Sequence, residues 1–381
     1  MPHHSQEERW MQHALELASA TTALVSPNPQ VGCVLVKDDK VIGEGAHLYD
    51  NRDHAEIIAL KDAARNGFDT AGATAYVTLE PCSHHGRTGP CADALIAARV
   101  ARVVVATVDP NPQVSGQGIA RLRNAGIDVT VGVLEQQARD LNDAFCSFIV
   151  RGTPLVTLKA ALSADGCLAP PTSSRAASQP QPYWITGREA RTEVQRLRHA
   201  SDAVLTGIDT VLADDPLLTD RSGLPRRQPL MRVILDTHLR IPAGSQLVRT
   251  ANRDLLVLCG PTADTSIREA LRAKGAEVRN IPERDGRLNL SAVLEALAER
   301  KILSVLLECG SKLNGAFLRE NLVDKVILFY AKTALGAHAL PFAEGIASPH
   351  DLEQKLRRMT QREFGPDICI SGMLRDPWPE T

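Results

Sequence analysis

Three residues of metal-ligand type, placed before two expected helices, restrict the fold of this chain more than any other feature. His54-Ala55-Glu56 opens one helical segment, and Pro81-Cys82 is followed at Cys91 by the start of another. A strand is expected between them at Ala73–Leu79. His-x-Glu alone or Pro-Cys alone is common, but this ordered set of strands, helices and ligands is specific.

The residue types favour a catalytic zinc ion. One imidazole (His54) and two thiolates (Cys82 and Cys91) supply three ligands and leave the fourth tetrahedral position for water. Zinc lowers the pKa of such a water from 15.7 to about 7. Glu56 is then placed to move a proton without binding the metal, which is the arrangement of zinc-dependent base deaminases. The alternatives are two core cysteines or a closed structural zinc site, with a histidine from the loop between the cysteines as fourth ligand.

Strand and helix segments alternate around this motif, which predicts a layered α/β domain with a largely parallel sheet. An amphipathic helix is expected at Gln6–Ala20, and Asn66-Gly67 is expected to end the helix that begins near Glu56. Further strands are expected at 30–36, 41–46, 103–107 and 129–133, and further helices at 91–98, before 124–126 and at 135–150.

A domain boundary is expected at Arg151-Gly152-Thr153-Pro154, because glycine and proline interrupt regular structure and a new strand follows at Leu155–Ala161. The chain then divides into residues 1–150 and 151–381. The second part is again α/β, with strands expected at 203–206, 232–235, 255–259, 304–307 and 326–329. Pro170–Pro182 is expected to be a mobile loop, and the tail from Arg375 is expected to be frayed.

Length, composition and charge exclude several classes of protein. The 381 residues suffice for roughly two or three domains. A content of 44% hydrophobic and 23% charged residues is that of a globular protein. A net charge of −2 argues against a protein that coats nucleic acid. Neither a membrane-spanning apolar run nor a secretory signal is expected, and the eight scattered cysteines indicate reduced thiols in a cytoplasmic protein.

The spacing of the two cysteines points to one family. Eight residues separate Cys82 from Cys91, more than the C-x-x-C of deaminases that act on free or tRNA bases. Together with the stretches Ser26–Gly32, Thr78–His84 and Asp109–Pro112, this long loop closely resembles the bifunctional riboflavin-biosynthesis family. In that family a diaminohydroxyphosphoribosylaminopyrimidine deaminase is fused to a 5-amino-6-(5-phosphoribosylamino)uracil reductase. The resemblance covers nearly the whole chain.

The resemblance implies a fold and a site for the first part. Residues 1–150 would form a cytidine-deaminase-like three-layer α/β/α domain, with His54, Cys82 and Cys91 as ligands of Zn2+ and Glu56 as the catalytic proton shuttle. The implied substrate-binding residues are Asn28, His47, His84 and Arg87. The guanidinium of Arg87 suits a substrate phosphate, and the alternative is that it is only a solvated charge on a loop. For His47 and His84 the alternative is an ordinary hydrogen-bonded histidine in a loop.

For residues 151–381 the resemblance implies a dihydrofolate-reductase-like α/β domain that uses NADPH. Motifs matched in order are Leu158-Lys159, Ser163–Gly166, Trp184–Gly187 and Thr210–Thr219. The implied NADPH contacts are Leu162, Trp184, Thr210, Asp214, Thr237 and the turn Gly310, Ser311, Lys312, Leu313, Asn314, Gly315 and Ala316. The implied substrate contacts are Lys159, Arg198, Leu218, Arg221 and Glu308. For each of these residues the alternative is a purely structural role in the core, at a helix cap or in a turn.

Two departures from the family leave an alternative open for the second part. Seventeen residues separate Gly166 from Trp184, more than is usual in the family, and Pro182 stands where a substrate-binding serine is expected. In this alternative the chain is an active deaminase whose second part is a degenerate, non-catalytic reductase-like domain. A nucleic-acid base deaminase with an accessory domain is a third interpretation, which the charge and the cysteine spacing disfavour.

The resulting hypothesis is a bifunctional enzyme of riboflavin (vitamin B2) biosynthesis. As a zinc-dependent hydrolase it deaminates 2,5-diamino-6-(5-phosphoribosylamino)pyrimidin-4(3H)-one to 5-amino-6-(5-phosphoribosylamino)uracil. As an NADPH-dependent oxidoreductase it then converts the ribosyl to a ribityl chain. The expected partners are small pyrimidine ribotides, with no nucleic acid and no membrane, and the family implies a homodimer formed through the reductase domain.

Overall fold

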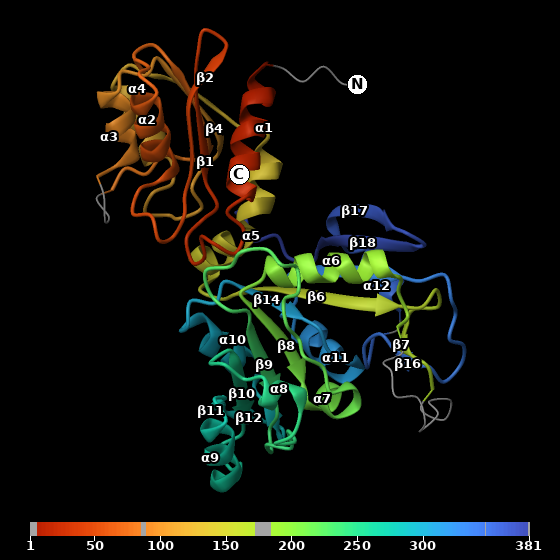
Figure 1. Cartoon of the computed structure of the whole chain (residues 1–381). Coiled ribbons are helices and arrows are strands. Elements are labelled where there is room, and N and C mark those ends of the chain that lie inside the picture. The colour runs from red at the N-terminus through yellow and green to blue at the C-terminus, as the bar shows by residue number, and fades with distance from the viewer. Residues whose placement is uncertain (1–5, 85–88, 172–183, 347, 380–381) are drawn as a thin grey trace. The chain divides into compact units, whose positions relative to one another are not determined.

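The computed structural model describes residues 6–84, 89–171, 184–346 and 348–379 (Figure 1). The chain forms two compact units. The first unit comprises Met1–Gly152, Pro225–Arg227 and Pro377–Thr381, and the second unit comprises Thr153–Leu224 and Gln228–Asp376. No helix in the described part of the chain has both the length and the apolar character that a membrane span requires.

The first unit is built on a five-stranded sheet of order β2-β1-β3-β4-β5. Its elements, in chain order, are α1 (Gln6–Ser19), β1 (Gly32–Lys37), β2 (Lys40–Ala46), α2 (Ala55–Arg65), β3 (Thr74–Leu79), α3 (Cys91–Ala97), β4 (Arg102–Thr107), α4 (Gln117–Asn124), β5 (Asp128–Val131) and α5 (Glu135–Arg151). Strands β3, β4 and β5 are parallel, but β1 is antiparallel to both β2 and β3. The expectation of a largely parallel sheet therefore holds for β3 to β5 only, because the β1–β2 hairpin reverses the chain.

Helices cover both faces of this sheet and produce three layers (Figure 1). One apolar cluster joins one strand face to α2, α3 and α4 through residues such as Ala59, Leu95 and Leu122. A second cluster joins the opposite face to α1 and α5 through Met11 and Ala138. Successive strand residues alternate between the two clusters, as the pleat requires. The first unit is thus the three-layer α/β/α domain that the resemblance implies.

Small residues hold α2 unusually close to β2. A Cβ added at Gly43 would lie 2.4 Å from the carbonyl oxygen of Ala59, and one at Gly45 would lie 2.6 Å from that of Ala55. No other residue type leaves space for this approach. Because α2 begins next to His54, this contact fixes the start of the helix against the sheet.

The end of the described chain is ordered, so the expectation of a frayed tail is wrong for Pro377 and Trp378. Trp378 is only 6% exposed, and its indole N–H donates to the Asp143 carboxylate over 2.9 Å. The Cys146 thiol donates to the carbonyl of Pro377 at 3.2 Å, and the Arg139 guanidinium lies 5.3 Å from the indole centroid. A large aromatic side chain with a satisfied N–H anchors the tail to α5, a contact that local sequence pattern does not reveal.

The second unit is built on a nine-stranded sheet of order β11-β10-β9-β8-β14-β6-β15-β18-β17. Its strands are β6 (Leu155–Leu162), β8 (Ala203–Gly207), β9 (Met231–Leu235), β10 (Leu255–Cys259), β11 (Glu277–Asn280), β14 (Ser304–Leu307), β15 (Lys325–Tyr330), β17 (Arg357–Phe364) and β18 (Asp367–Met373). Its helices are α6 (Arg188–His199), α7 (Ile208–Asp214), α8 (Gln246–Arg249), α9 (Thr265–Ala273), α10 (Leu290–Ala298), α11 (Ser311–Arg319) and α12 (Pro349–Glu353). Short hairpins pair β7 (Cys167–Ala169) with β16 (Leu340–Pro341) and β12 (Glu283–Arg284) with β13 (Arg287–Leu288).

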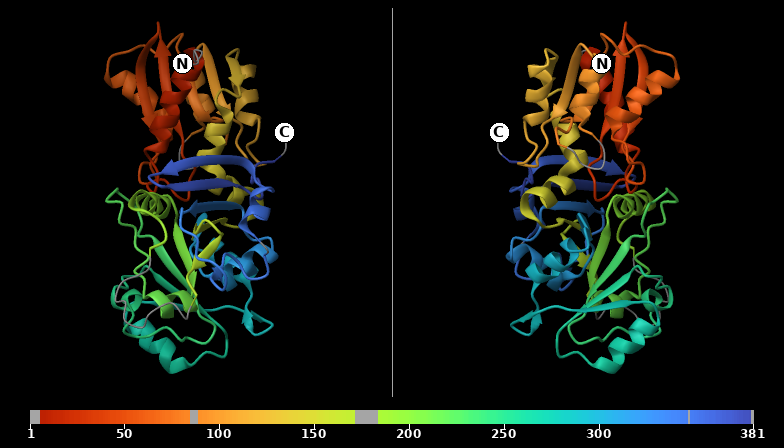
Figure 2. Two further views of the ribbon diagram at one scale, coloured as in Figure 1. Left: turned by 90° about the vertical axis from the view of Figure 1, so that its right-hand side faces the viewer. Right: turned by 90° about the vertical axis from the view of Figure 1, so that its left-hand side faces the viewer.

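All neighbouring strands of this sheet are parallel from β11 to β15, and β18 and β17 add an antiparallel hairpin (blue in Figure 2). The five strands predicted between 203 and 329 are confirmed. The sequence pattern does not predict the β17–β18 hairpin. Strand β17 is exposed along nearly its whole length, so buried and exposed residues do not alternate along it. Most of the predicted loop 170–182 lies outside the described residues.

We expect Trp378→Ala to lower the free energy of unfolding of the first unit by about 3–5 kcal/mol, the usual cost of removing a buried tryptophan. Amide hydrogen exchange should then accelerate in α5 more than in β14 of the second unit. Phe68→Ala is the matched control, because Phe68 is an aromatic residue of the same unit that is 49% exposed. Equal exchange in α5 of the Trp378→Ala variant and the unmodified protein would contradict the anchoring role.

Candidate active sites

The ends of local elements bring the three predicted metal ligands together. His54 is the residue before α2, Cys82 follows β3 after a short turn, and Cys91 is the first residue of α3. The Nδ1 atom of His54 lies 3.5 Å from the sulfur of Cys82 and 3.3 Å from that of Cys91. All three donor atoms lie within 4.8 Å of one another. Among the described residues this is the one such group of three or more metal-ligand types.

These distances fit a tetrahedral zinc ion. Bonds of about 2.3 Å to sulfur and about 2.0–2.1 Å to nitrogen, at tetrahedral angles, place the two ligand atoms about 3.5 Å apart. The backbone N–H of Cys91 donates to the sulfur of Cys82 at 3.3 Å. A hydrogen bond from the Cys91 thiol, together with the nearby His54 ring, lowers the pKa of the Cys82 thiol. This shift favours the thiolate form that binds zinc.

Glu56 lies in the first turn of α2 and is 3% exposed. Burial raises the pKa of its carboxyl to about 7, and the nearby Cys82 sulfur adds to the effect. Such a group can hold and release a proton near neutral pH, as a general acid–base catalyst must.

Asn28 and His47 form a pair next to the metal-ligand cluster. The Asn28 amide nitrogen lies 2.9 Å from Nε2 of His47, and Nδ1 of His47 lies 3.0 Å from the carbonyl oxygen of Asp53. The rings of His47 and His54 lie edge to face, with centroids 5.4 Å apart. Two of the predicted substrate residues thus flank the cluster, and burial lowers the pKa of His47.

The remaining predicted substrate residues of this unit are on the loop between the cysteines. His84 is exposed, and Arg87 lies outside the described residues. The sequence analysis assigned no role to Glu80, which is 3% exposed. Its carboxylate accepts backbone N–H bonds from Asp109, Gly116, Gly118 and Ile119 at 2.8–3.2 Å. It therefore fixes the loop after β4, where burial raises the pKa of Asp109 to about 6.

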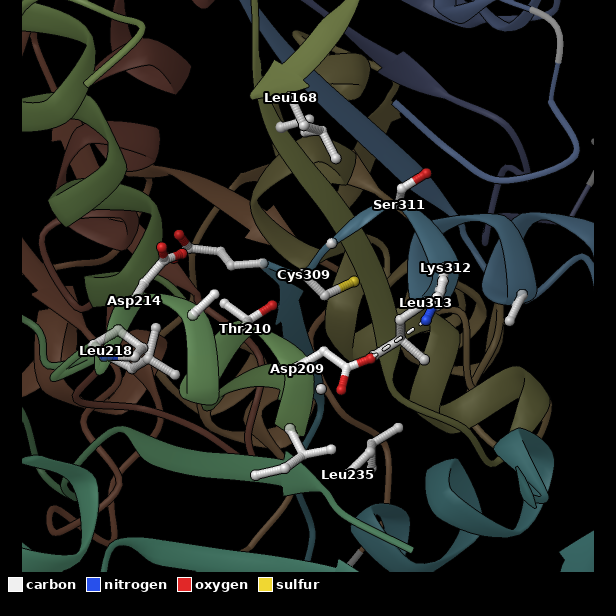
Figure 3. Close-up of a pocket in the computed structure, with 18 of the residues that line it drawn as sticks. Leu168, Asp209, Thr210, Asp214, Leu218, Leu235, Cys309, Ser311, Lys312 and Leu313 are labelled. Atoms are coloured by element: carbon white, nitrogen blue, oxygen red, sulfur yellow. Dashed lines mark ion pairs between the residues drawn. The ribbon is translucent and has the colours of Figure 1, made fainter. Parts of the chain in front are cut away.

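The second unit contains a cavity of about 1850 Å³ at the carboxyl ends of its parallel strands (Figure 3). Crevices at this edge of a parallel sheet are the usual ligand sites of α/β proteins. All five predicted substrate residues line it, namely Lys159, Arg198, Leu218, Arg221 and Glu308. Nine predicted NADPH residues also line it: Trp184, Thr210, Asp214, Thr237, Gly310, Ser311, Lys312, Leu313 and Ala316.

Three other predicted NADPH residues do not line the cavity. Leu162 is fully buried in the apolar core. Asn314 is also fully buried and donates to the carbonyl of Phe342 at 2.9 Å. A Cβ at Gly315 would lie 2.1 Å from the carbonyl oxygen of Glu344, so this glycine permits a close backbone approach. Asn314 and Gly315 thus fix α11 against the segment around Phe342 and Glu344. Contact with a cofactor stays a prediction for all three residues.

Three buried charges meet at one wall of the cavity. The guanidinium of Arg198 holds Glu308 through two bonds, from Nε to Oε1 at 2.7 Å and from Nη2 to Oε2 at 3.2 Å. The Lys159 ammonium lies 3.6 Å from Oε2. Burial opposes ionisation of Glu308, but the two cations outweigh it and lower the pKa of the carboxyl, while burial lowers the pKa of Lys159. The wall carries a net positive charge, which suits a phosphorylated or developing anionic group.

Further basic residues that line the cavity were missed by the sequence analysis. Arg240, Arg284 and Arg287 line the cavity, and Arg240 bonds to Asp209 at 2.7 Å. Lys312 lies 3.8 Å from the other oxygen of Asp209 (Figure 3). Isolated arginines in loops and short hairpins carry no motif, so only the folded chain brings them together.

Family models match both parts of the chain. Residues 4–107 match the family model of the cytidine and deoxycytidylate deaminase zinc-binding region, and residues 154–370 match the RibD C-terminal domain. The riboflavin biosynthesis protein RibD of Escherichia coli is 41% identical over 384 residues, covering 96% of this chain and 98% of that protein. That of Aquifex aeolicus is 39% identical over 364 residues, covering 96% and 97%.

Solved structures of riboflavin biosynthesis proteins also match along nearly the whole chain. Acinetobacter baumannii RibD matches with a TM-score of 0.81 at 39% identity, covering 97% of this chain and 98% of that one. The Thermotoga maritima diaminohydroxyphosphoribosylaminopyrimidine deaminase/5-amino-6-(5-phosphoribosylamino)uracil reductase matches with a TM-score of 0.82 at 34% identity and the same coverage. The zinc-binding and RibD reductase domains imply Zn2+ and NADPH as cofactors. With two-domain relatives matched along nearly its whole length, this chain belongs to the RibD family of riboflavin biosynthesis proteins.

Proposed function

We propose that residues 1–150 carry the deaminase reaction of this bifunctional riboflavin-biosynthesis enzyme and that residues 151–381 carry its reductase reaction. The observation that supports this assignment most directly is that each unit has its own site. The first has the His54, Cys82 and Cys91 cluster, and the second has the cavity with Lys159 and Glu308.

In the deaminase reaction, His54 through Nδ1 and the thiolates of Cys82 and Cys91 hold the zinc ion. A bound zinc ion would activate a water for attack on the aminopyrimidine carbon that bears the leaving amine. Glu56 takes one proton from this water and gives it to the ring nitrogen. It then passes the second proton of the water to the departing amine, which leaves as ammonia. Its raised pKa suits both transfers, because it can be protonated and deprotonated near neutral pH.

Four residues bind the ribotide in this scheme. Asn28 and His47 present hydrogen-bonding groups to the pyrimidine beside the zinc ligands. His84 and Arg87, on the loop between the cysteines, face the ribose phosphate, for which a guanidinium is a bidentate partner.

In the reductase reaction, Thr210, Asp214 and the start of α11 would hold NADPH in the cavity, and its nicotinamide would supply a hydride for the ribosyl carbon. The bond from this carbon to the ring oxygen would break, and the oxygen would take up a proton, which leaves the open ribityl chain. Lys159 lies at the buried wall, and its lowered pKa favours proton transfer to the sugar oxygen that takes up charge. Glu308 and Arg198 fix Lys159 in place. A buried charge cluster of this kind favours an active reductase over a degenerate domain.

The two activities are separable in one experiment. The purified protein is incubated with 2,5-diamino-6-(5-phosphoribosylamino)pyrimidin-4(3H)-one, with and without NADPH, and the products are followed by mass spectrometry. We expect the deaminated uracil ribotide without NADPH, and a product two hydrogens heavier with NADPH. Deamination without reduction in both samples would contradict the reductase assignment and support the degenerate alternative.

Single variants should abolish one activity and spare the other. Glu56→Gln should lower ammonia release by at least about a hundredfold, since general acid–base catalysis contributes about 10²–10⁴-fold. It should keep one zinc per chain and reduce the uracil ribotide normally. Lys159→Met should show the opposite pattern. Normal deamination by Glu56→Gln would exclude the proposed proton shuttle.

We also propose that the protein acts in the cytoplasm as a homodimer. None of the eight cysteines, all of which lie among the described residues, forms a disulfide, which suits a reducing compartment. Strand β17 is at the edge of the nine-stranded sheet with Met359 57% exposed, and an open strand edge is suited to pairing with a second copy. Analytical ultracentrifugation should give about twice the chain mass, and a monomer at micromolar concentration would exclude a stable dimer.

A further inference from the structure

Residues far from the metal-ligand motif in sequence complete the first unit. Pro225–Arg227 belong to the first unit, whereas the residues on either side of them belong to the second. Arg227 is half-buried there and contacts two loops that carry predicted deaminase substrate residues. No sequence motif of the deaminase includes this position.

Arg227 binds the first loop twice. Its backbone N–H donates to the carbonyl oxygen of Ala23 at 3.0 Å. Its guanidinium Nη2 donates to the carbonyl oxygen of Ser26 at 2.5 Å. Ser26 precedes Asn28 by two residues, so both contacts restrain the backbone that presents the Asn28 amide.

The same side chain binds the second loop. The Arg227 guanidinium lies 3.9 Å from the centroid of the Tyr49 ring, a cation–π distance. Tyr49 is two residues after His47, and its backbone N–H donates to the carbonyl of Leu24 at 3.3 Å. One guanidinium therefore bridges the loops that hold the Asn28–His47 pair.

The far end of the Asn28 loop has a separate restraint from within the first 150 residues. The Asn142 side chain accepts from the backbone N–H of Gln30 at 2.8 Å and donates to the carbonyl of Gln30 at 3.0 Å. The Gln30 side chain donates to the carbonyl of Leu141 at 3.0 Å. Without Arg227 the loop would keep these bonds at Gln30 and the Tyr49–Leu24 backbone bond, but it would lose both bonds at Ala23 and Ser26.

We propose that Arg227 is a positioning residue of the deaminase, which holds the Ala23–Asn28 loop and Tyr49 so that Asn28 and His47 meet the pyrimidine ribotide. This inference rests on the proposed function of the first unit. Arg227 touches neither the metal ligands nor Glu56 in any described contact, so it acts through the loops. Its loss lowers the fraction of molecules in the binding-competent arrangement, and the apparent affinity falls by that fraction.

Steady-state ammonia release by the full-length, zinc-loaded protein tests this role. Arg227→Ala should raise the KM for the diaminopyrimidine ribotide about tenfold, as expected if about a tenth of the molecules keep the arrangement, with kcat changed less than about twofold. Arg227→Lys retains a cation over Tyr49 and should give an intermediate KM. Added guanidinium ion should lower the KM of Arg227→Ala and leave the unmodified protein unchanged.

Two controls separate positioning from general stability. Arg65→Ala removes an arginine of the same unit whose side chain is 73% exposed, and it should leave KM unchanged. Reduction of preformed uracil ribotide by Arg227→Ala should also be normal. The nearby reductase residue Arg221 has its own restraint, from its N–H to the Gln195 side chain at 2.9 Å.

Two results would overturn the inference. One is an unchanged KM in Arg227→Ala. The other is loss of zinc and of kcat without guanidinium rescue, which would show that Arg227 only supports the fold. Should Arg227→Ala fail to fold, an unchanged KM in Arg227→Lys together with an unchanged KM in Tyr49→Leu would overturn it. No ammonia release from the unmodified protein would instead refute the proposed deaminase function itself.

Discussion

The convergence of one imidazole and two thiolates is the constraint on which the first unit depends. Two donors at helix starts, from His54 and Cys91, and one after β3, from Cys82, lie within 4.8 Å of one another. Neither helix can therefore shift by much without separating them. The glycines of β2 admit α2 to the sheet, and the Glu80 carboxylate holds the loop after β4 beside Cys82. Packing far from the donors thus determines the distances among them.

The pKa of a shielded glutamate is shifted in opposite directions in the two units. Glu56 has no cationic side chain bonded to it among the described contacts, and burial raises its pKa. The side chain of Glu308 is also largely shielded, at 12% exposure, but Arg198 and Lys159 lower its pKa. The first group is therefore suited to carry protons, and the second is suited to remain a fixed anion that orders two cations. The same residue type thus has two different roles, and its neighbours decide which.

The sequence predicts the elements and the metal-ligand set well, because both depend on local pattern. Strand–helix alternation identifies β1 to β6 and most of the parallel strands that follow, and the residues opening α2 and α3 identify the ligand cluster. Long-range contacts carry no such pattern. The indole of Trp378 against Asp143 and the Arg227 contacts join residues that are distant in sequence. The β17–β18 hairpin is local but equally unmarked, because the exposed strand β17 shows no alternation. Nothing in the local sequence distinguishes Arg227 from its neighbour Arg226.

The return of Trp378 to α5 has a consequence for how the protein is made. A ribosome releases α5 long before it reaches codon 378, because the whole second unit is translated in between. The bond between the Trp378 indole and the Asp143 carboxylate can therefore form only after the second unit has been translated. The first unit is complete only after the second has been synthesised. A gene split at the linker near Gly152 would place Asp143 and Trp378 on different chains, and the first unit would then lack this contact unless the two chains associated.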